Sequence, residues 1–218
     1  MKYLDVPMSG SLQSRTYSRN RYGQYQRSRA TPVNPATSYQ TLVRGRLTAA
    51  STAWRALTDS QRMGWEALGL MMSRSDSLGQ SYTLNGFTAY VSVNSNLLSA
   101  GDAAVSDAPA IVTPGALATV TTTLTAIAFS IAYTATPLPA LTKLLAFLSP
   151  MQSAGRQFNA DFRLVHVSAA AAASPANVLA AYTARCGVPV VGTRIFWSLV
   201  LHKGGFLSSP VTGSQVVA

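Results

Sequence analysis

The sequence predicts an α+β protein of several parts: an extended basic N-terminal arm, a small three-helix unit and a C-terminal antiparallel β-sandwich. Three observations lead to this fold class. Basic residues gather near the N-terminus, apolar residues recur every three or four positions between residues 36 and 99, and they alternate with small or polar residues after residue 116. The 218 residues are enough to build a sizeable core.

Residues 1–35 combine arginine, tyrosine, serine and amide side chains with almost no aliphatic ones. Residues 1–50 hold eight basic side chains against Asp5 alone, within a formal net charge of +10. Neither a helical nor a strand period is sustained, and Pro32 and Pro35 favour an extended exit. Because little apolar surface is available to offset the entropy of ordering, we expect this arm to be disordered alone and to order on a partner.

Residues 36–99 are predicted to form a helical unit. A helix is expected to begin at about residue 37, because one face carries Tyr39, Leu42, Val43, Leu47, Ala50, Trp54 and Leu57. Thr58 and Gln61 match a capping box at the start of a second helix. The buried side of that helix is expected to hold Met63, Trp65, Leu68 and Met72. A short extended piece over residues 81–84 precedes a third helix that contains Phe87 and Tyr90.

Residues 100–115 have the small residues and prolines that are typical of a linker, and residues 116–218 alternate like strands. The alternating apolar positions are Ile127, Phe129, Ile131 and Tyr133, and then Ile195, Trp197, Leu199 and Leu201. Ser174 and Pro175 favour a helix over residues 176–185, and Gly204 with Gly205 is a hairpin signal. About six strands in roughly 100 residues indicate a sandwich of the immunoglobulin or fibronectin type III kind.

The residues that catalysis and metal binding require are few and scattered. His166 and His202 lie in predicted strands without an acidic or cysteine partner at metal-ligand spacing. The single cysteine, Cys186, lies at a predicted helix C-terminus, which disfavours a thiolate. Seven acidic residues fall into no catalytic pair, and no phosphate-loop or nucleophile-elbow motif is present. We therefore expect no enzyme, no catalytic residue, no cofactor and no metal site.

The hydropathy of the chain predicts no association with a membrane. No stretch reaches the 18 or more apolar residues of a membrane span, and the first residues lack the apolar core of a signal peptide. Charged residues make up only 11% of the chain, which is low for a protein that stays soluble alone. The composition therefore indicates that partners cover part of the surface.

Three sequence runs, SRNRYGQYQRSRATPVNP, AWRALTDSQRMGW and NGFTAYVSVN, resemble a family of uncharacterised proteins in tailed-bacteriophage and bacterial genomes. In that family a basic arm precedes a W-x-x-L-T-x-x-Q-R-x-x-W helical unit and an immunoglobulin- or fibronectin-like tail. The resemblance covers most of the chain and brings no activity residue by residue. It implies a phage or prophage setting, and a virion component rather than an enzyme.

We therefore expect a structural bacteriophage virion protein, a capsid decoration or cement protein or another head- or tail-associated component. It would dock on neighbouring capsid or tail subunits as a homo-oligomer in an assembly, in the virion and, before assembly, in the host cytoplasm. Arginine makes directed, bidentate hydrogen bonds and tyrosine offers a large contact area, which makes such side chains suitable anchors. The predicted anchors are Arg15, Arg19, Arg21, Tyr22, Tyr25, Arg27 and Arg29.

The alternative is a non-enzymatic nucleic-acid-binding accessory protein that uses the basic arm on phosphates. A third class, a sandwich adhesin for host carbohydrate, has only Trp197 and Tyr133 in its favour, and both are assigned to the core. The sequence leaves open whether the arm contacts protein or nucleic acid, and whether the location is capsid, tail or portal.

Overall fold

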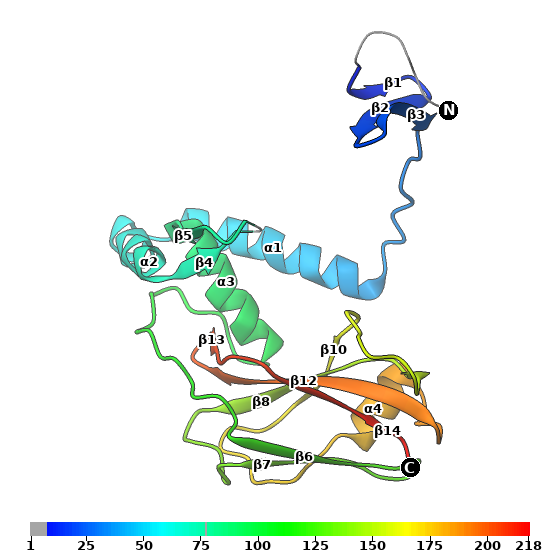
Figure 1. Cartoon of the computed structure of the whole chain (residues 1–218). Helices are drawn as coiled ribbons and strands as arrows, with labels where there is room; N and C mark the ends of the chain where they lie inside the picture. Colours follow the sequence, from blue (N-terminus) through cyan, green and yellow to red (C-terminus); the bar gives the residue numbers. More distant parts are fainter. Residues whose placement is uncertain (1–7, 77) are drawn as a thin grey trace. The chain divides into compact units, whose positions relative to one another are not determined.

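The computed structural model describes residues 8–76 and 78–218, and this part of the chain contains four α-helices and several antiparallel sheets (Figure 1). The α+β class is therefore as the sequence predicts. The chain divides into two compact units between Arg44 and Gly45, inside helix α1 (Ser38–Ala56). The first seven residues of the predicted arm lie outside the described residues.

The N-terminal unit holds a three-stranded antiparallel sheet in the order β1 (Gly10–Leu12), β2 (Arg15–Asn20) and β3 (Gly23–Ser28). A two-residue turn, Arg21 and Tyr22, joins β2 to β3. Gly23 has a φ of 112°, a conformation that glycine adopts readily and other residues rarely do. Residues 29–37 follow without regular structure before α1 begins.

This sheet corrects the expectation of an arm without regular structure. Successive side chains of each strand point to opposite faces of the sheet, as in any strand. Both faces carry polar side chains, so the hydropathy of the sequence does not alternate with a period of two. The signals that remain are local: a glycine after the Arg21–Tyr22 turn, and tyrosine and threonine residues that favour strands.

The second unit begins with the rest of α1, followed by α2 (Asp59–Met71) and α3 (Gly86–Ser99). The hairpin of β4 (Ser73–Ser75) and β5 (Ser81–Thr83) joins α2 to α3. The predicted capping box is confirmed, since the Gln61 amide donates to Thr58 Oγ1 at 3.3 Å and the Thr58 amide donates to Gln61 Oε1 at 3.0 Å. Asn85 caps α3 by accepting from the Thr88 amide at 2.7 Å.

A cluster of aromatic rings forms the core of the helices. The ring centroids of Trp54 and Tyr90 lie 5.5 Å apart, and those of Trp65 and Tyr90 lie 5.1 Å apart. Trp65 and Leu68 are buried, as predicted. Met63 is not: 64% of its surface is exposed, because the buried side of α2 runs through Trp65, Leu68 and Gly69.

Two glycines allow α2 to approach the start of α3 closely. A Cβ atom on Gly69 would lie 2.5 Å from the carbonyl oxygen of Leu84, and one on Gly86 would lie 2.8 Å from Cγ of Glu66. Real Cβ atoms do not approach other atoms this closely, and a Cβ on Gly86 would also lie 3.0 Å from the backbone nitrogen of Glu66, so the packing of these helices requires glycine.

The segment predicted as a linker, residues 100–115, is bound along the helices instead. Val105 exchanges two hydrogen bonds with the buried side chain of Asn94, at 2.7 and 3.2 Å. Trp65 Nε1 donates to the carbonyl oxygen of Ser106 at 2.8 Å. Residues 45–218 consequently form one compact unit, with no division at the predicted linker.

The C-terminal half of the second unit is built from two antiparallel sheets that face each other. One has the order β11 (Ala176–Asn177), β7 (Phe129–Thr134), β6 (Thr119–Leu124). The other runs from β10 (Arg163–Val167) through β8 (Lys143–Leu148) to the long strand β12 (Thr193–Lys203). β12 also pairs with β9 (Gln152–Ser153), β13 (Phe206–Leu207) and β14 (Val211–Val216).

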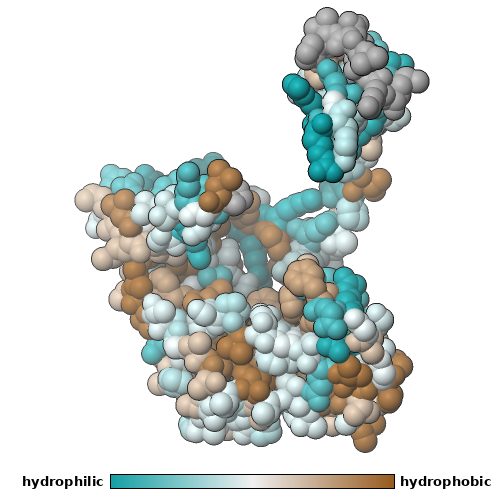
Figure 2. All heavy atoms as spheres, viewed as in Figure 1, coloured by the Kyte–Doolittle hydropathy of each residue, from teal (hydrophilic) through white to brown (hydrophobic). Residues whose placement is uncertain are grey.

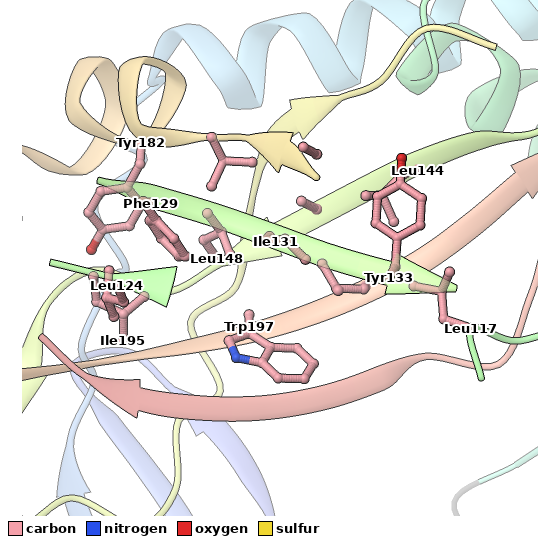
Figure 3. Close-up of a cluster of buried hydrophobic side chains, with 14 of the residues drawn as sticks. Leu117, Leu124, Phe129, Ile131, Tyr133, Leu144, Leu148, Tyr182, Ile195 and Trp197 are labelled. Atoms are coloured by element: carbon pink, nitrogen blue, oxygen red, sulfur yellow. The ribbon is translucent and has the colours of Figure 1, made fainter. Parts of the chain in front are cut away.

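The core between the sheets contains the apolar residues that alternate along the strands (Figure 3). The prediction is confirmed for Phe129, Ile131 and Tyr133, and for Ile195, Trp197, Leu199 and Leu201. The prediction is wrong for Ile127, which is 86% exposed. It lies in the turn where the Thr125 amide donates to the Ala128 carbonyl oxygen at 2.8 Å.

The helix predicted over residues 176–185 starts later than expected. Ala176 and Asn177 pair with β7 as strand β11, and helix α4 covers Leu179–Cys186. Backbone pairing with a distant strand thus overrides the local Ser-Pro start signal. The hairpin at Gly204 and Gly205 is confirmed, since both have positive φ and Lys203 pairs with Phe206.

We predict that Gly69→Ala destabilises the full-length protein by about 1–3 kcal/mol, because the new methyl group collides with backbone at Leu84. Gly64→Ala in the same helix is the control. Its Cβ would make ordinary contact with Ala108 at 3.6 Å, and alanine favours the helix by about 1 kcal/mol. Urea unfolding measures both free energies. Equal effects of the two substitutions would contradict the close packing at Gly69.

Candidate interaction surface on the N-terminal sheet

The strand register sorts the side chains of the N-terminal sheet onto two faces, because residues directly opposite each other on neighbouring strands share a face. Arg15 pairs with Ser28, Tyr17 with Gln26, and Arg19 with Gln24. On the other side of β2, Tyr17 pairs with Gly10. We call this surface the arginine face. Its members are Arg15, Tyr17, Arg19, Gln24, Gln26 and Ser28, together with Leu12 of β1, which pairs with Arg15.

Hydrogen bonds hold parts of the arginine face in place. Arg15 Nη1 donates to Oε1 of Gln26 at 3.3 Å, across the two strands. Gln24 Nε2 donates to the carbonyl oxygen of Met8 at 2.8 Å. The guanidinium of Arg15 therefore lies over the sheet rather than extending away from it.

The opposite face is chemically different, and we call it the hydroxyl face. Its members on the three strands are Ser11, Thr16, Ser18, Tyr25 and Arg27. The hydroxyl groups of Ser11 and Thr16 lie 3.0 Å apart and hydrogen-bond to each other. This face carries one arginine where the arginine face carries two.

The structure therefore separates the seven predicted anchors. Arg15 and Arg19 lie on the arginine face, and Tyr25 and Arg27 lie on the hydroxyl face. The connecting turn holds the other pair, in which the guanidinium carbon of Arg21 lies 4.7 Å from the ring centroid of Tyr22. Arg29 follows β3, and its amide donates to the Ser14 carbonyl oxygen at 2.7 Å.

Five members of the arginine face were not among the predicted anchors: Leu12, Tyr17, Gln24, Gln26 and Ser28. Composition singles out charged and aromatic residues. Membership of one face depends instead on a spacing of two residues along β2 and on which residues lie opposite on the neighbouring strands. Only the register supplies those partners, so a sequence without a visible hydrophobic period does not show them.

No residue between 8 and 44 is buried, and none belongs to either hydrophobic cluster of the protein. A small sheet needs an apolar face packed on something to be stable in water. At the beginning of α1 the apolar side chains are exposed as well: Tyr39 by 59%, Leu42 by 46% and Val43 by 44%. The part of the N-terminal unit that the structure describes, residues 8–44, thus has ordered strands and no hydrophobic core.

The charge of this unit is unbalanced. Residues 8–44 include six arginines and no acidic residue. Figure 2 shows hydrophilic side chains over much of the described sheet. An unopposed set of guanidinium groups on exposed strands favours an anionic partner, either carboxylate or phosphate.

The histidines and the cysteine lie in the second unit and are held by packing. His202 is buried; its Nε2 accepts from the Gly205 amide at 3.1 Å, and its Nδ1 lies 3.8 Å from Oδ2 of Asp102. Lys143 Nζ approaches Oδ1 of the same Asp102 at 2.6 Å. Burial lowers the pKa of His202 below its usual 6.5, which outweighs the raising effect of Asp102, so the imidazole is neutral at pH 7.

His166 and Cys186 are also shifted by burial. The pKa of His166 in β10 lies below its usual 6.5. The pKa of Cys186 at the end of α4 lies above its usual 9.0, with burial as the largest cause, so the group is a thiol rather than a thiolate nucleophile. Within residues 8–76 and 78–218, no three His, Cys, Asp or Glu side chains gather as a metal site would require.

None of the helices in the described part of the chain combines the length and apolarity needed to cross a bilayer. Comparison with protein-family models, with curated proteins and with solved structures gives no match for this chain.

We predict that the stability advantage of the wild type over His202→Gln shrinks as the pH falls below about 6.5. The unfolded chain takes up a proton there that the buried imidazole does not, so the unfolded state is favoured as the pH drops. Glutamine has no such proton, and groups common to both proteins cancel in the difference. Thermal unfolding between pH 8 and 5 measures the effect, and an advantage that is constant with pH would contradict it.

Proposed function

We propose that this chain is a structural, non-enzymatic protein of a bacteriophage virion that docks on neighbouring capsid or tail subunits through its N-terminal sheet. The observation that supports this most is a sheet of three ordered strands that holds five arginines at or beside it and buries no residue. The virion setting itself rests on the sequence motifs that resemble the phage-associated family.

A partner supplies what the sheet lacks. Ordering the backbone costs about 1–2 kcal/mol per residue, and in a sheet this small the burial of apolar surface normally offsets it. The second unit meets that cost with two hydrophobic clusters, one among the helices and one between the sheets. The N-terminal unit has no comparable cluster among residues 8–44, so we infer that contact with a partner adds to the stabilisation that hydrogen bonds and turns give the sheet.

A protein partner suits the composition of the sheet better than DNA does. Serine, threonine, glutamine and tyrosine side chains stand between the arginines on both faces. Such side chains can satisfy the varied polar groups of a polypeptide, whereas phosphate binding selects mainly for dense positive charge. In an assembly with many copies, modest affinity per copy is reinforced by avidity.

We further propose that the sandwich is of the fibronectin type III kind. Taken in chain order, the seven main strands are β6, β7, β8, β10, β11, β12 and β14. The first, second and fifth form one sheet, and the other four form the second sheet. This differs from the immunoglobulin constant-type order only in the fourth strand, which pairs with the third. The fold by itself does not determine the function of the module.

The test replaces Arg15, Arg19, Arg21, Arg27 and Arg29 with alanine in the full-length protein. We expect the number of copies per particle to fall at least tenfold, because each charge-assisted hydrogen bond to a partner contributes about 1.5–3 kcal/mol. Quantitative mass spectrometry of particles made from the accompanying structural genes measures occupancy. The thermal unfolding midpoint of the second unit should not change.

Arg55→Ala, Arg74→Ala and Lys203→Ala together form the charge control, since these residues lie in the second unit. This triple variant should keep normal occupancy. Normal occupancy of the five-arginine variant would refute the docking proposal. Binding of the wild type to random duplex DNA with a steep salt dependence, together with absence from particles, would favour the accessory-protein alternative.

A further inference from the structure

We propose that the sandwich binds a small organic acid, with the carboxylate on Lys203 and the apolar body in a cavity at one end of the core. The cavity has a volume of about 230 Å³, and of the described residues that line it only Lys203 is charged. This inference concerns the second unit and goes beyond the docking proposal, which it does not require.

The cavity lies where the core between the two sheets ends. It is formed by the ends of β7 and β12 and by the segments that lead into β6 and β8. The buried residues Leu138, Thr142 and Leu201 line its inner part, and the exposed residues Ala116 and Thr134 line its mouth. The cavity is therefore an open continuation of the hydrophobic core.

Lys203 occupies the position at which the row of core residues along β12 reaches this cavity. Trp197, Leu199 and Leu201 alternate along the strand and pack in the core, and the next position with the same spacing is Lys203. A lysine at such a place can cover the end of a core with its apolar stem and leave its ammonium in water. Here the stem leaves about 230 Å³ unfilled beside Leu201. The core row thus ends in apolar space next to a positive charge.

The charge of Lys203 is not neutralised by the protein. Its ammonium forms no ion pair or side-chain hydrogen bond with any residue of 8–76 and 78–218. Asp102 and Lys143 line a neighbouring cavity that also borders Lys203, but Lys143 Nζ lies 2.6 Å from Oδ1 of Asp102. Because these two side chains form an ion pair with each other, the charge left at this end of the sandwich is that of Lys203.

One positive charge beside an apolar cavity selects a ligand with one negative charge and an apolar body. A carboxylate carries one negative charge, which a single lysine can neutralise. A phosphate monoester carries nearly two at neutral pH and would keep about one of them unpaired. The ligand chemistry that fits is therefore a monocarboxylic acid.

The volume of the cavity limits the size of that acid. A volume of about 230 Å³ has room for about seven groups of the size of a water molecule. This corresponds to a short alkyl chain or a single ring, with the carboxylate at the ammonium of Lys203. Because the cavity is already formed, binding requires little rearrangement of the protein.

The experiment titrates hexanoate into the full-length protein and follows binding by ligand-observed NMR. Hexan-1-ol has the same chain without the charge, and hexylamine has the opposite charge. We expect one saturable site for hexanoate, with an affinity at least fivefold higher than that for hexan-1-ol, and still weaker binding of hexylamine. Butanoate should bind at least fivefold more weakly than hexanoate, because each buried methylene contributes about fourfold to the affinity.

Two variants locate the site. Lys203→Met keeps the apolar stem and removes the charge, so hexanoate should bind at least fivefold more weakly while hexan-1-ol binds as before. Ala116→Leu narrows the mouth of the cavity and should weaken the binding of both ligands.

Two further variants are controls. Lys203→Arg keeps the positive charge and should bind hexanoate within threefold of the wild type. Arg55→Met removes one positive charge from the same unit at a residue that does not line the cavity, and it should bind hexanoate like the wild type.

Equal affinities for hexanoate and hexan-1-ol would overturn the inference, and so would a Lys203→Met variant that binds hexanoate like the wild type. Absence of saturable binding of hexanoate would also overturn it. Tighter binding of the peptide acetyl-Gly-Gly-Leu, with a free carboxyl end, than of hexanoate would overturn the assignment to a small acid in favour of the end of a polypeptide chain.

Particle occupancy is a separate measurement, so this inference and the docking proposal can fail independently. The charge control for docking includes Lys203→Ala and should lose hexanoate binding while it keeps normal occupancy. The five-arginine variant should lose occupancy and keep hexanoate binding, because none of its substitutions lies in the second unit.

Discussion

The contact between helix α3 and the hairpin that ends β12 holds the second unit together. A Cβ atom on Gly205 would lie 2.5 Å from Cγ1 of Val93, so the hairpin reaches the helix only because residue 205 is glycine. Asn96 Nδ2 donates to the Gly205 carbonyl oxygen at 2.8 Å, and Phe206 packs against the helical cluster. Since β12 also contributes Ile195, Trp197 and Leu199 to the sandwich core, the hairpin of β12 and β13 connects the two hydrophobic clusters.

Polar contacts around this junction fix the segment between α3 and the sandwich. Lys143 on β8 donates to the Ala100 carbonyl oxygen at 2.9 Å and pairs with Asp102, next to the buried His202. Asp102 and Lys143 also line a surface pocket beside Leu141 and Lys203. Lys143 satisfies the carbonyl oxygen at the C-terminal end of α3, and His202 accepts from the Gly205 amide at the end of β12, which gives both side chains a structural role.

The two units therefore differ in how they are stabilised. The second unit buries apolar residues in two clusters and needs no partner to explain its fold. The described part of the N-terminal unit, residues 8–44, orders three strands on hydrogen bonds and turn geometry, and its arginines and tyrosines lie at exposed or partly exposed positions. This difference is the physical basis for our proposal that the N-terminal sheet is a docking surface.

Several local features follow from the sequence by itself. Four of them can be recognised from neighbouring residues alone. They are the capping box at Thr58, the apolar alternation from Ile195 to Leu201, the glycine hairpin at residues 204 and 205, and the excess of arginine near the N-terminus. Other features depended on partners distant in sequence. Packing against α3 decided which side of α2 is buried and left Met63 exposed, and pairing with β7 turned the predicted helix start at Ala176 into a strand. The faces of the N-terminal sheet were decided in the same way, because both carry polar residues and only the pairing of β1, β2 and β3 places Arg15, Tyr17 and Arg19 together.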